Sequence, residues 1–173
     1  MSNNAIILCG LPGSGKSTWA RFYALSHKAI IVNKDAFRTM FKGQYFFDKD
    51  YEELVGACAR DAALEALKQG FDVILDETNI TMERRRNWAL IFKPVAKVYL
   101  LWFSETDNNL KYRCIDQRGM SRDAWRFVIE GMKADFEAPV ASETCFDGIM
   151  KVSGPDLENV EYIIDNANLG NLT

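Results

Sequence analysis

A glycine-rich stretch near the start of the chain has the residue types that bind phosphate. It reads Gly10-Leu-Pro-Gly-Ser-Gly15-Lys16-Ser17 and matches the pattern G-x-x-x-x-G-K-[ST], between an apolar run and a segment of helical period. The glycines permit backbone turns that aim N–H groups at phosphate oxygens, and the helix that follows adds the positive end of its dipole. We expect Lys16 to reach the β- and γ-phosphates of ATP and the Ser17 hydroxyl to bind Mg²⁺. The predicted nucleotide site comprises Gly10, Leu11, Pro12, Gly13, Ser14, Gly15, Lys16, Ser17, Thr18 and Arg118.

Two acidic residues, Asp76 and Glu77, follow the apolar run Val73-Ile74-Leu75. A carboxylate at the carboxyl edge of a parallel sheet can hold Mg²⁺ through water. We therefore predict Asp76 as the metal ligand, with Glu77 able to share that role. The alternative for both residues is an acidic side chain that caps the next turn.

Asp35 follows the second apolar run, so we expect its carboxylate in the same crevice as the phosphate-binding loop. Phosphoryl transfer to an alcohol needs a positioned base for the attacking hydroxyl, and a carboxylate can serve. If a helix begins at Asp35, Arg38 lies on the same face and can hold a phosphate of the acceptor. The alternative is that Asp35 caps this helix and Arg38 lies on a solvated face.

Aromatic residues surround Arg38 in the sequence. They either stack a nucleobase beside Arg38 or pack into the core of the protein. They are Phe37, Phe41, Tyr45, Phe46, Phe47 and Tyr51.

Arginines gather around Gly119, in a segment from about residue 113 to 136 that has the character of a helical lid. Arg118 lies in the turn before a helix that Ser121 can cap, and an arginine there can neutralise charge on the transferred phosphoryl group. The other arginines of the segment, Arg113, Arg122 and Arg126, include ordinary solvated residues. The run Arg84-Arg85-Arg86 cannot form one patch, because successive helical residues point about 100° apart, so one of the three at most faces the acceptor.

Apolar runs alternate with segments of helical period along the chain. We predict strands over 5–9, 29–32, 71–75, 95–103 and 149–152, and helices over about 16–25, 50–69, 81–92, 105–114 and 121–136. Asp50 and Glu53 resemble a capping box, and Gly70 is a natural stop for the second helix. For residues 157–165 the pattern fits either a helix or an additional strand. The fold class is therefore α/β, with a mostly parallel five-stranded sheet and helices on both faces.

Length and composition indicate one domain over residues 1–173, since no linker, repeat or low-complexity stretch divides the chain. Scattered cysteines and the absence of a predicted leader or membrane anchor indicate a cytoplasmic protein that does not contact membranes. The net charge of −3 argues against a protein that grips long duplexes. The oligomeric state cannot be predicted from this sequence.

Several blocks together resemble the kinase domain of phage-type polynucleotide 5′-kinases. They are the phosphate-binding loop with Thr18-Trp-Ala-Arg21, then Asn33-Lys-Asp35-Ala-Phe-Arg38, then Asp76-Glu-Thr-Asn79 with Glu83 to Trp88, and Gln117-Arg118-Gly119. The resemblance implies that Asp35 is the general base for a 5′-hydroxyl, that Arg38 binds the acceptor's phosphate, and that Arg118 is the lid residue on the donor. In the phage enzyme the acidic residue before Thr-Asn aligns with Glu77 instead of Asp76, so which of the two serves the metal stays open.

Two other interpretations remain. The same arrangement is similar to that of zeta-toxin-like and other small-molecule kinases, which implies a sugar, antibiotic or metabolite alcohol as the acceptor. The third interpretation is a nucleotide-binding regulatory module without catalysis, in which Asp35 and Arg118 would be idle.

Overall fold

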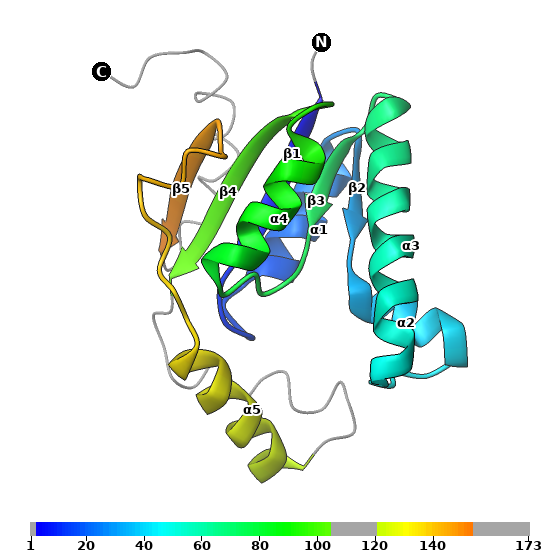
Figure 1. Cartoon of the computed structure of the whole chain (residues 1–173), viewed down its shortest axis with the longest axis vertical. Helices are drawn as coiled ribbons and strands as arrows, with labels where there is room; N and C mark the ends of the chain where they lie inside the picture. The colour runs from blue at the N-terminus through cyan, green and yellow to red at the C-terminus, as the bar shows by residue number, and fades with distance from the viewer. Residues whose placement is uncertain (1–2, 105–120, 154–173) are drawn as a thin grey trace.

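The computed structural model describes residues 3–104 and 121–153 of the chain (Figure 1). Within them, five strands form one sheet in the order β2-β3-β1-β4-β5, and every neighbouring pair is parallel. This confirms the predicted α/β fold, and each predicted strand end lies within two residues of the observed one. The strands are β1 Asn4–Cys9, β2 Ala29–Val32, β3 Asp72–Leu75, β4 Lys97–Ser104 and β5 Gly148–Ser153.

α1, α3, α4 and α5 agree with the predicted helices to within two residues at each end, whereas α2 was considered only as a helix beginning at Asp35. The predicted helix over 105–114 and the undecided segment 157–165 lie outside the described residues. Thr81 and Ser121 cap α4 and α5, because their side chains accept hydrogen bonds from the backbone N–H groups of Arg84 and Ala124. The helices are α1 Lys16–Ser26, α2 Lys34–Lys42, α3 Lys49–Lys68, α4 Met82–Phe92 and α5 Arg122–Ala134.

The start of α3 differs from the predicted capping box. Asp48 is the capping residue, and its carboxylate accepts from the backbone N–H of Asp50, so the cap lies two residues before the one that the pattern of Asp50 and Glu53 indicated. The stop at Gly70 is confirmed, since that residue has a φ of 81°, which favours glycine.

Helices cover both faces of the sheet, as α4 and α1 show in Figure 1. Alternate residues of β1 separate the two layers: Ala5, Ile7 and Cys9 pack with α3 and α4, whereas Ile6 and Leu8 pack with Trp19, Ala20 and Tyr23 of α1. Strands that are buried on both faces read as continuous apolar runs, which is why the sequence pattern located them well.

The central strand β1 is the point where the chain changes direction across the sheet. Its neighbours are β3 on one side and β4 on the other, with β2 beyond β3 and β5 beyond β4. In open α/β sheets, ligands bind in the crevice at the carboxyl ends of the strands beside such a switch point. The loop after β1 is the predicted phosphate-binding loop, so the fold places it at that crevice.

A buried ion pair fixes the segment after α5 to the rest of the domain. Arg85 of α4 is fully buried, and its guanidinium donates to the Glu143 carboxylate from Nε and Nη2 at 2.9 and 2.6 Å. Its Nη1 also donates to the carbonyl oxygens of Ile80 and Glu137. Arg84 and Arg86 are exposed. The central arginine of the run is therefore structural and does not face an acceptor.

Replacing Arg85 with Ala should lower the free energy of unfolding by about 3–5 kcal/mol, because it leaves the Glu143 carboxylate buried without its charged partner. Urea unfolding followed by circular dichroism measures the change. Arg84→Ala is the matched control on the exposed side of α4, and it should change stability by less than about 0.5 kcal/mol. Equal losses for the two variants would contradict this account of the ion pair.

Candidate active site at the carboxyl edge of the sheet

The phosphate-binding loop has the backbone that its glycines predict. Gly10, Gly13 and Gly15 have φ values of 149, 80 and 98°. A Cβ on Gly10 would lie 2.7 Å from the Phe103 carbonyl oxygen, so no other residue fits there without a shift of the backbone. Gly15 is the N-cap of α1 and provides no side chain to the first-turn N–H groups. Such a helix start is suited to an anion.

The two side chains predicted to act on the donor lie in the first turn of α1. Lys16 is buried, and its ammonium donates to the Leu11 carbonyl oxygen at 2.8 Å and to the Ser14 hydroxyl at 3.2 Å. The lysine therefore folds over the loop that it is predicted to serve. Ser17 and Thr18 are exposed at the same helix start.

Hydrogen bonds connect the segments that follow β1, β2 and β3. The backbone N–H of Gly10 donates to the Thr78 carbonyl oxygen at 2.9 Å, and that of Asp76 donates to the Val32 carbonyl oxygen at 3.0 Å. The buried Asn79, with a φ of 42°, donates from its side-chain amide to the Leu8 carbonyl oxygen at 2.8 Å. These bonds join the loop after β3 to the phosphate-binding loop.

Asn33 connects the predicted base to the predicted metal ligand. Its side-chain oxygen caps α2 by accepting from the backbone N–H groups of Asp35 and Ala36 at 2.8 and 3.3 Å. Its side-chain nitrogen donates to the Asp76 carbonyl oxygen at 2.6 Å. The helix begins at Lys34, one residue before the predicted start, and the cap is Asn33. The cap-only interpretation of Asp35 is therefore wrong.

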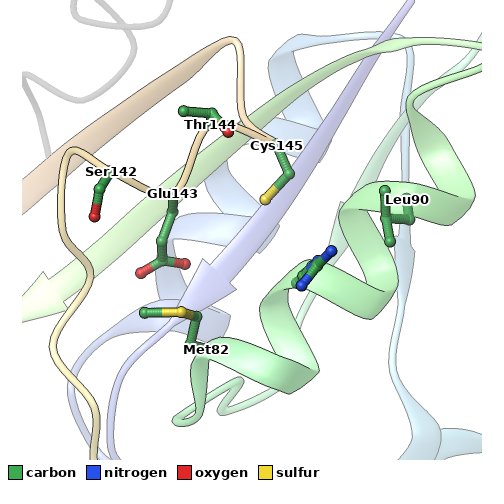
Figure 2. Close-up of a pocket in the computed structure, with 7 residues that line it drawn as sticks. Met82, Leu90, Ser142, Glu143, Thr144 and Cys145 are labelled. Atoms are coloured by element: carbon green, nitrogen blue, oxygen red, sulfur yellow. The ribbon is translucent and has the colours of Figure 1, made fainter.

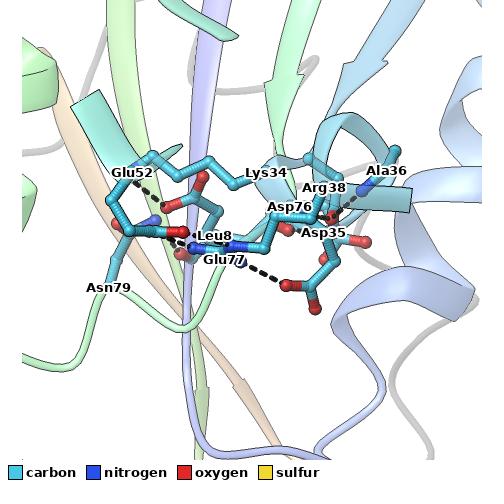
Figure 3. A network of polar contacts seen from close by, with 10 residues as sticks. Leu8, Lys34, Asp35, Ala36, Arg38, Glu52, Asp76, Glu77 and Asn79 are labelled. Carbon is cyan, nitrogen blue, oxygen red and sulfur yellow. Dashed lines mark hydrogen bonds and ion pairs between the residues drawn. The ribbon is translucent and has the colours of Figure 1, made fainter. Parts of the chain in front are cut away.

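The structure brings Asp35 and Arg38 together, as the spacing predicted (Figure 3). The Arg38 guanidinium donates from Nη1 to the Asp35 carboxylate. It also donates from Nε and Nη2 to the carboxylate of Glu52, at 2.8 and 2.6 Å. The hydrogen bond from Arg38 is the main cause that lowers the pKa of Glu52. The side chain of Arg38 is thus held between two carboxylates and does not lie on a solvated face.

Glu52 was not predicted from the sequence, although a signal for it exists. It lies three residues before Val55 and seven before Ala59, both buried, so the helical period places it on the face of α3 that turns inward. Arg85 carries the same kind of signal, because it precedes the buried Trp88 and Phe92 by three and seven residues. A charged residue on an otherwise apolar face indicates a buried partner.

The two acidic residues after β3 differ in their surroundings. Asp76 is buried at the strand end. Glu77 has one carboxylate oxygen 3.6 Å from the Lys34 ammonium, whereas its other oxygen is buried and has no hydrogen-bond partner within the described residues. Burial raises the pKa of Glu77, which Lys34 partly offsets. Figure 3 shows both residues beside Asp35 and Arg38.

This donor set fits Mg²⁺. The ion prefers oxygen ligands, and in phosphate sites it takes one or two carboxylates together with water and phosphate oxygens. The exposed Ser17 hydroxyl, the Asp76 carboxylate and the unpartnered oxygen of Glu77 are such ligands. No cluster of three or more His, Cys, Asp or Glu side chains suited to a metal occurs in residues 3–104 and 121–153, so a cage built from protein side chains alone is not found there.

Part of the predicted site lies beyond what the structure describes. Arg118, Arg113 and the first half of the predicted lid fall in residues 105–120. The second half is α5, on which Arg126 is exposed and Trp125 and Ile129 are buried. No described helix is long and apolar enough to cross a membrane.

A separate pocket lies between α4 and the segment 142–145 (Figure 2). Its lining includes Met82, Leu90 and Cys145, and none of the residues predicted to bind nucleotide, metal or acceptor. The pocket is therefore distinct from the candidate active site.

Replacing Asn33 with Ala should lower the free energy of unfolding by about 2 kcal/mol, because the cap of α2 and the bond to the Asp76 carbonyl are both lost. Asn33→Asp keeps an oxygen for the cap but has no N–H for that carbonyl, so a smaller loss is expected. Chemical denaturation measures both, and hydrogen exchange at the amides of Asp35 and Ala36 reports the cap directly. Protection of these amides that is unchanged in Asn33→Ala would contradict the assignment.

Comparison with known proteins gives a family and several relatives. The family described as AAA domain, AAA_33, matches residues 6–139. An L-seryl-tRNA(Sec) kinase of Methanococcus maripaludis is 30% identical over 139 residues, which cover 78% of this chain and 52% of the relative. A bifunctional polynucleotide phosphatase/kinase of Schizosaccharomyces pombe is 28% identical over 145 residues, covering 80% and 31%. The chain thus spans about half or less of the length of these curated relatives.

Solved structures agree with the fold. A chain in the structure of the Pnkp1/Rnl/Hen1 RNA repair complex superimposes with a TM-score of 0.64 at 26% identity, over 79% of this chain and 47% of that one. The polynucleotide kinase resemblance is therefore confirmed at the level of family and fold. Because the family match covers most of the sequence and the parallel sheet carries its phosphate-binding loop at the switch point, the chain belongs to the AAA_33 family and contains a nucleotide-binding P-loop domain of the kinase type.

Proposed function

We propose that this domain transfers the γ-phosphoryl group of ATP to the 5′-hydroxyl end of a nucleic acid and requires Mg²⁺. The observation that carries the proposal is the Asp35–Arg38 pair, which lies at the same sheet edge as the phosphate-binding loop. In a nucleic acid with a free 5′-hydroxyl, the first sugar carries that hydroxyl and a 3′-phosphate. A carboxylate can accept the proton of the hydroxyl, and a guanidinium beside it can bind the phosphate. The relatives named as polynucleotide kinases support this acceptor.

The donor side is formed by the loop after β1. Its N–H groups and Lys16 would hold the β- and γ-phosphates, and Ser17 with Asp76, or with Glu77, would hold the metal ion. Bound there, Mg²⁺ would offset negative charge on the phosphate oxygens. Arg118 is proposed as the lid residue that approaches the same phosphates.

The acceptor side is formed by the start of α2. Neighbouring strands lie about 4.8 Å apart, so the ends of β1 and β2, which have β3 between them, are roughly 10 Å apart. We propose that this gap holds the phosphoryl group in transfer, with Lys16 on one side and Asp35 on the other. Asp35 takes the hydroxyl proton, the hydroxyl oxygen bonds to the γ-phosphorus, and the bond from that phosphorus to ADP breaks.

The charges around Arg38 favour a second candidate, a small alcohol without a phosphate. The contacts to Glu52 and Asp35 occupy three of the five N–H groups of the guanidinium and give the triad a net charge of −1. A phosphate group must approach Arg38 against that charge, whereas a neutral alcohol need not. The relative named a kinase of L-seryl-tRNA(Sec) adds that acceptors in this family differ.

One assay separates these proposals from the third candidate, a nucleotide-binding module without catalysis. The protein is incubated with γ-labelled ATP and Mg²⁺, and is offered a 5′-hydroxyl oligonucleotide, a nucleoside 3′-monophosphate and a set of small alcohols. We expect label on the oligonucleotide, and its loss when EDTA removes the metal. Label on a small alcohol alone would support the second candidate. Tight binding of ATP without any transfer would support the third.

Replacing Asp35 with Ala should lower kcat about 100-fold or more and leave the affinity for ATP nearly unchanged, because a general base acts on the chemical step. Steady-state transfer kinetics measure kcat, and titration calorimetry measures ATP binding. Asp61→Ala is the matched control, an exposed carboxylate of α3 paired with the adjacent Arg60. Unchanged turnover in Asp35→Ala would remove Asp35 from the mechanism.

A further inference from the structure

The aromatic residues around Arg38 do not form part of the core as a group. No residue of α2 is buried, and Phe37 is the member of the group that packs partly against the core. Phe46, Phe47 and Tyr51 lie at the junction of α2 and α3, and we call these three the junction aromatics. Core packing therefore does not account for the junction aromatics.

Two of the junction aromatics are tied to each other and to a lysine. The rings of Phe46 and Tyr51 meet edge to face, with centroids 5.2 Å apart. The Lys42 ammonium lies 4.7 Å from the Tyr51 ring centroid and donates to the Tyr51 hydroxyl at 3.1 Å. These contacts connect the loop after α2 to the first turn of α3, on either side of Phe47.

Phe47 is the exposed member, with 62% of its surface accessible. The centroid of its ring lies 5.6 Å from the central guanidinium carbon of Arg38. Arg38 is itself held by Asp35 and Glu52, so the ring lies beside the proposed acceptor site. Burial does not explain a large apolar ring at this position, since most of it is in contact with solvent.

We propose that Phe47 is a specificity-determining residue that stacks against the terminal nucleobase of the acceptor. In a nucleotide, the base, the 5′-oxygen and the 3′-phosphate belong to one sugar. An acceptor with its 5′-oxygen at Asp35 and its 3′-phosphate at Arg38 therefore presents its base a few bond lengths from Arg38, which is where Phe47 lies. Stacking on an aromatic side chain tolerates any base, because each base has a π face, and a neighbouring arginine adds to it.

This assignment rests on the proposed function and makes it more specific. A neutral sugar or another saturated small alcohol has no aromatic π face to stack against Phe47. A protein surface would be expected to use a wider apolar patch than this one ring among charged side chains. The combination of an exposed ring, a guanidinium and a carboxylate in one place suits a nucleoside whose 5′-hydroxyl is free.

The test compares two acceptors that differ in one base. Both are 5′-hydroxyl oligonucleotides of the same sequence, and in one of them the first nucleoside is abasic. For the wild-type protein, we expect the KM of the abasic acceptor to be about tenfold higher, as the loss of one stacked base implies. Phe47→Ala should raise the KM of the normal acceptor about tenfold, leave that of the abasic acceptor unchanged, and leave kcat and the KM of ATP unchanged. Phe47→Trp should restore the preference for the base.

Met40→Ala is the matched control, because Met40 is an exposed apolar residue of the neighbouring helix α2, with 66% of its surface accessible. It should not change the ratio of the two KM values. If the wild-type protein labels oligonucleotides and Phe47→Ala treats both acceptors as the wild type does, the stacking assignment is wrong and the proposed function stands. An equal rise in KM for both acceptors also overturns the assignment. If the wild-type protein labels neither acceptor, the proposed function and this inference fail together.

Discussion

The carboxyl ends of β1, β3 and β2 open at one edge of the sheet, and the arrangement of the candidate site depends on this constraint. β2 and β3 end level with each other, and β1 continues for two more residues. Parallel pairing sets Val32 and Ile7 opposite Leu75, so the residues that follow each strand emerge at one edge. The loop after β1 has the form of a phosphate cradle, β3 ends in two acidic residues, and β2 leads into the helix that carries Asp35 and Arg38. None of these groups is near another in the sequence. The parallel register of β1, β3 and β2 brings these groups to one edge of the sheet.

Asparagine side chains maintain that edge. Asn33 and Asn79 each use one amide to replace a hydrogen bond that the sheet cannot supply where its strands end, and Asn33 joins the start of α2 to the end of β3. Farther out, Arg85 anchors the segment after α5 to α4 through Glu143. The segment that follows the proposed lid is therefore held to α4 by a buried ion pair, and a contact of this kind is lost at a high cost in free energy.

Local patterns in the sequence predicted most of the strands and helices, but contacts between residues that are distant in the sequence were missed. The strands and the phosphate-binding loop were located well, because continuous apolar runs and a glycine pattern depend on local chemistry. Asp35 and Arg38 were predicted to lie together, because side chains three positions apart on one helix lie on the same face. Their partner Glu52 lies on another helix, and its position depends on how α2 turns into α3, which no local pattern specifies. The cap at Asn33 was missed by two residues, because Asn33 and Asp35 are both residue types that cap helices.

The central claim is that Asp35 and Lys16 act from opposite sides on one phosphoryl group. The most direct measurement is a crystal structure of the protein with Mg²⁺, a non-hydrolysable ATP analogue and a short 5′-hydroxyl oligonucleotide. The account predicts the Asp35 carboxylate within hydrogen-bond distance of the 5′-oxygen, with that oxygen in line with the γ-phosphorus and Lys16 on the phosphates. A complex in which the 5′-oxygen lies elsewhere, and Asp35 contacts neither it nor any other acceptor hydroxyl, would contradict the claim.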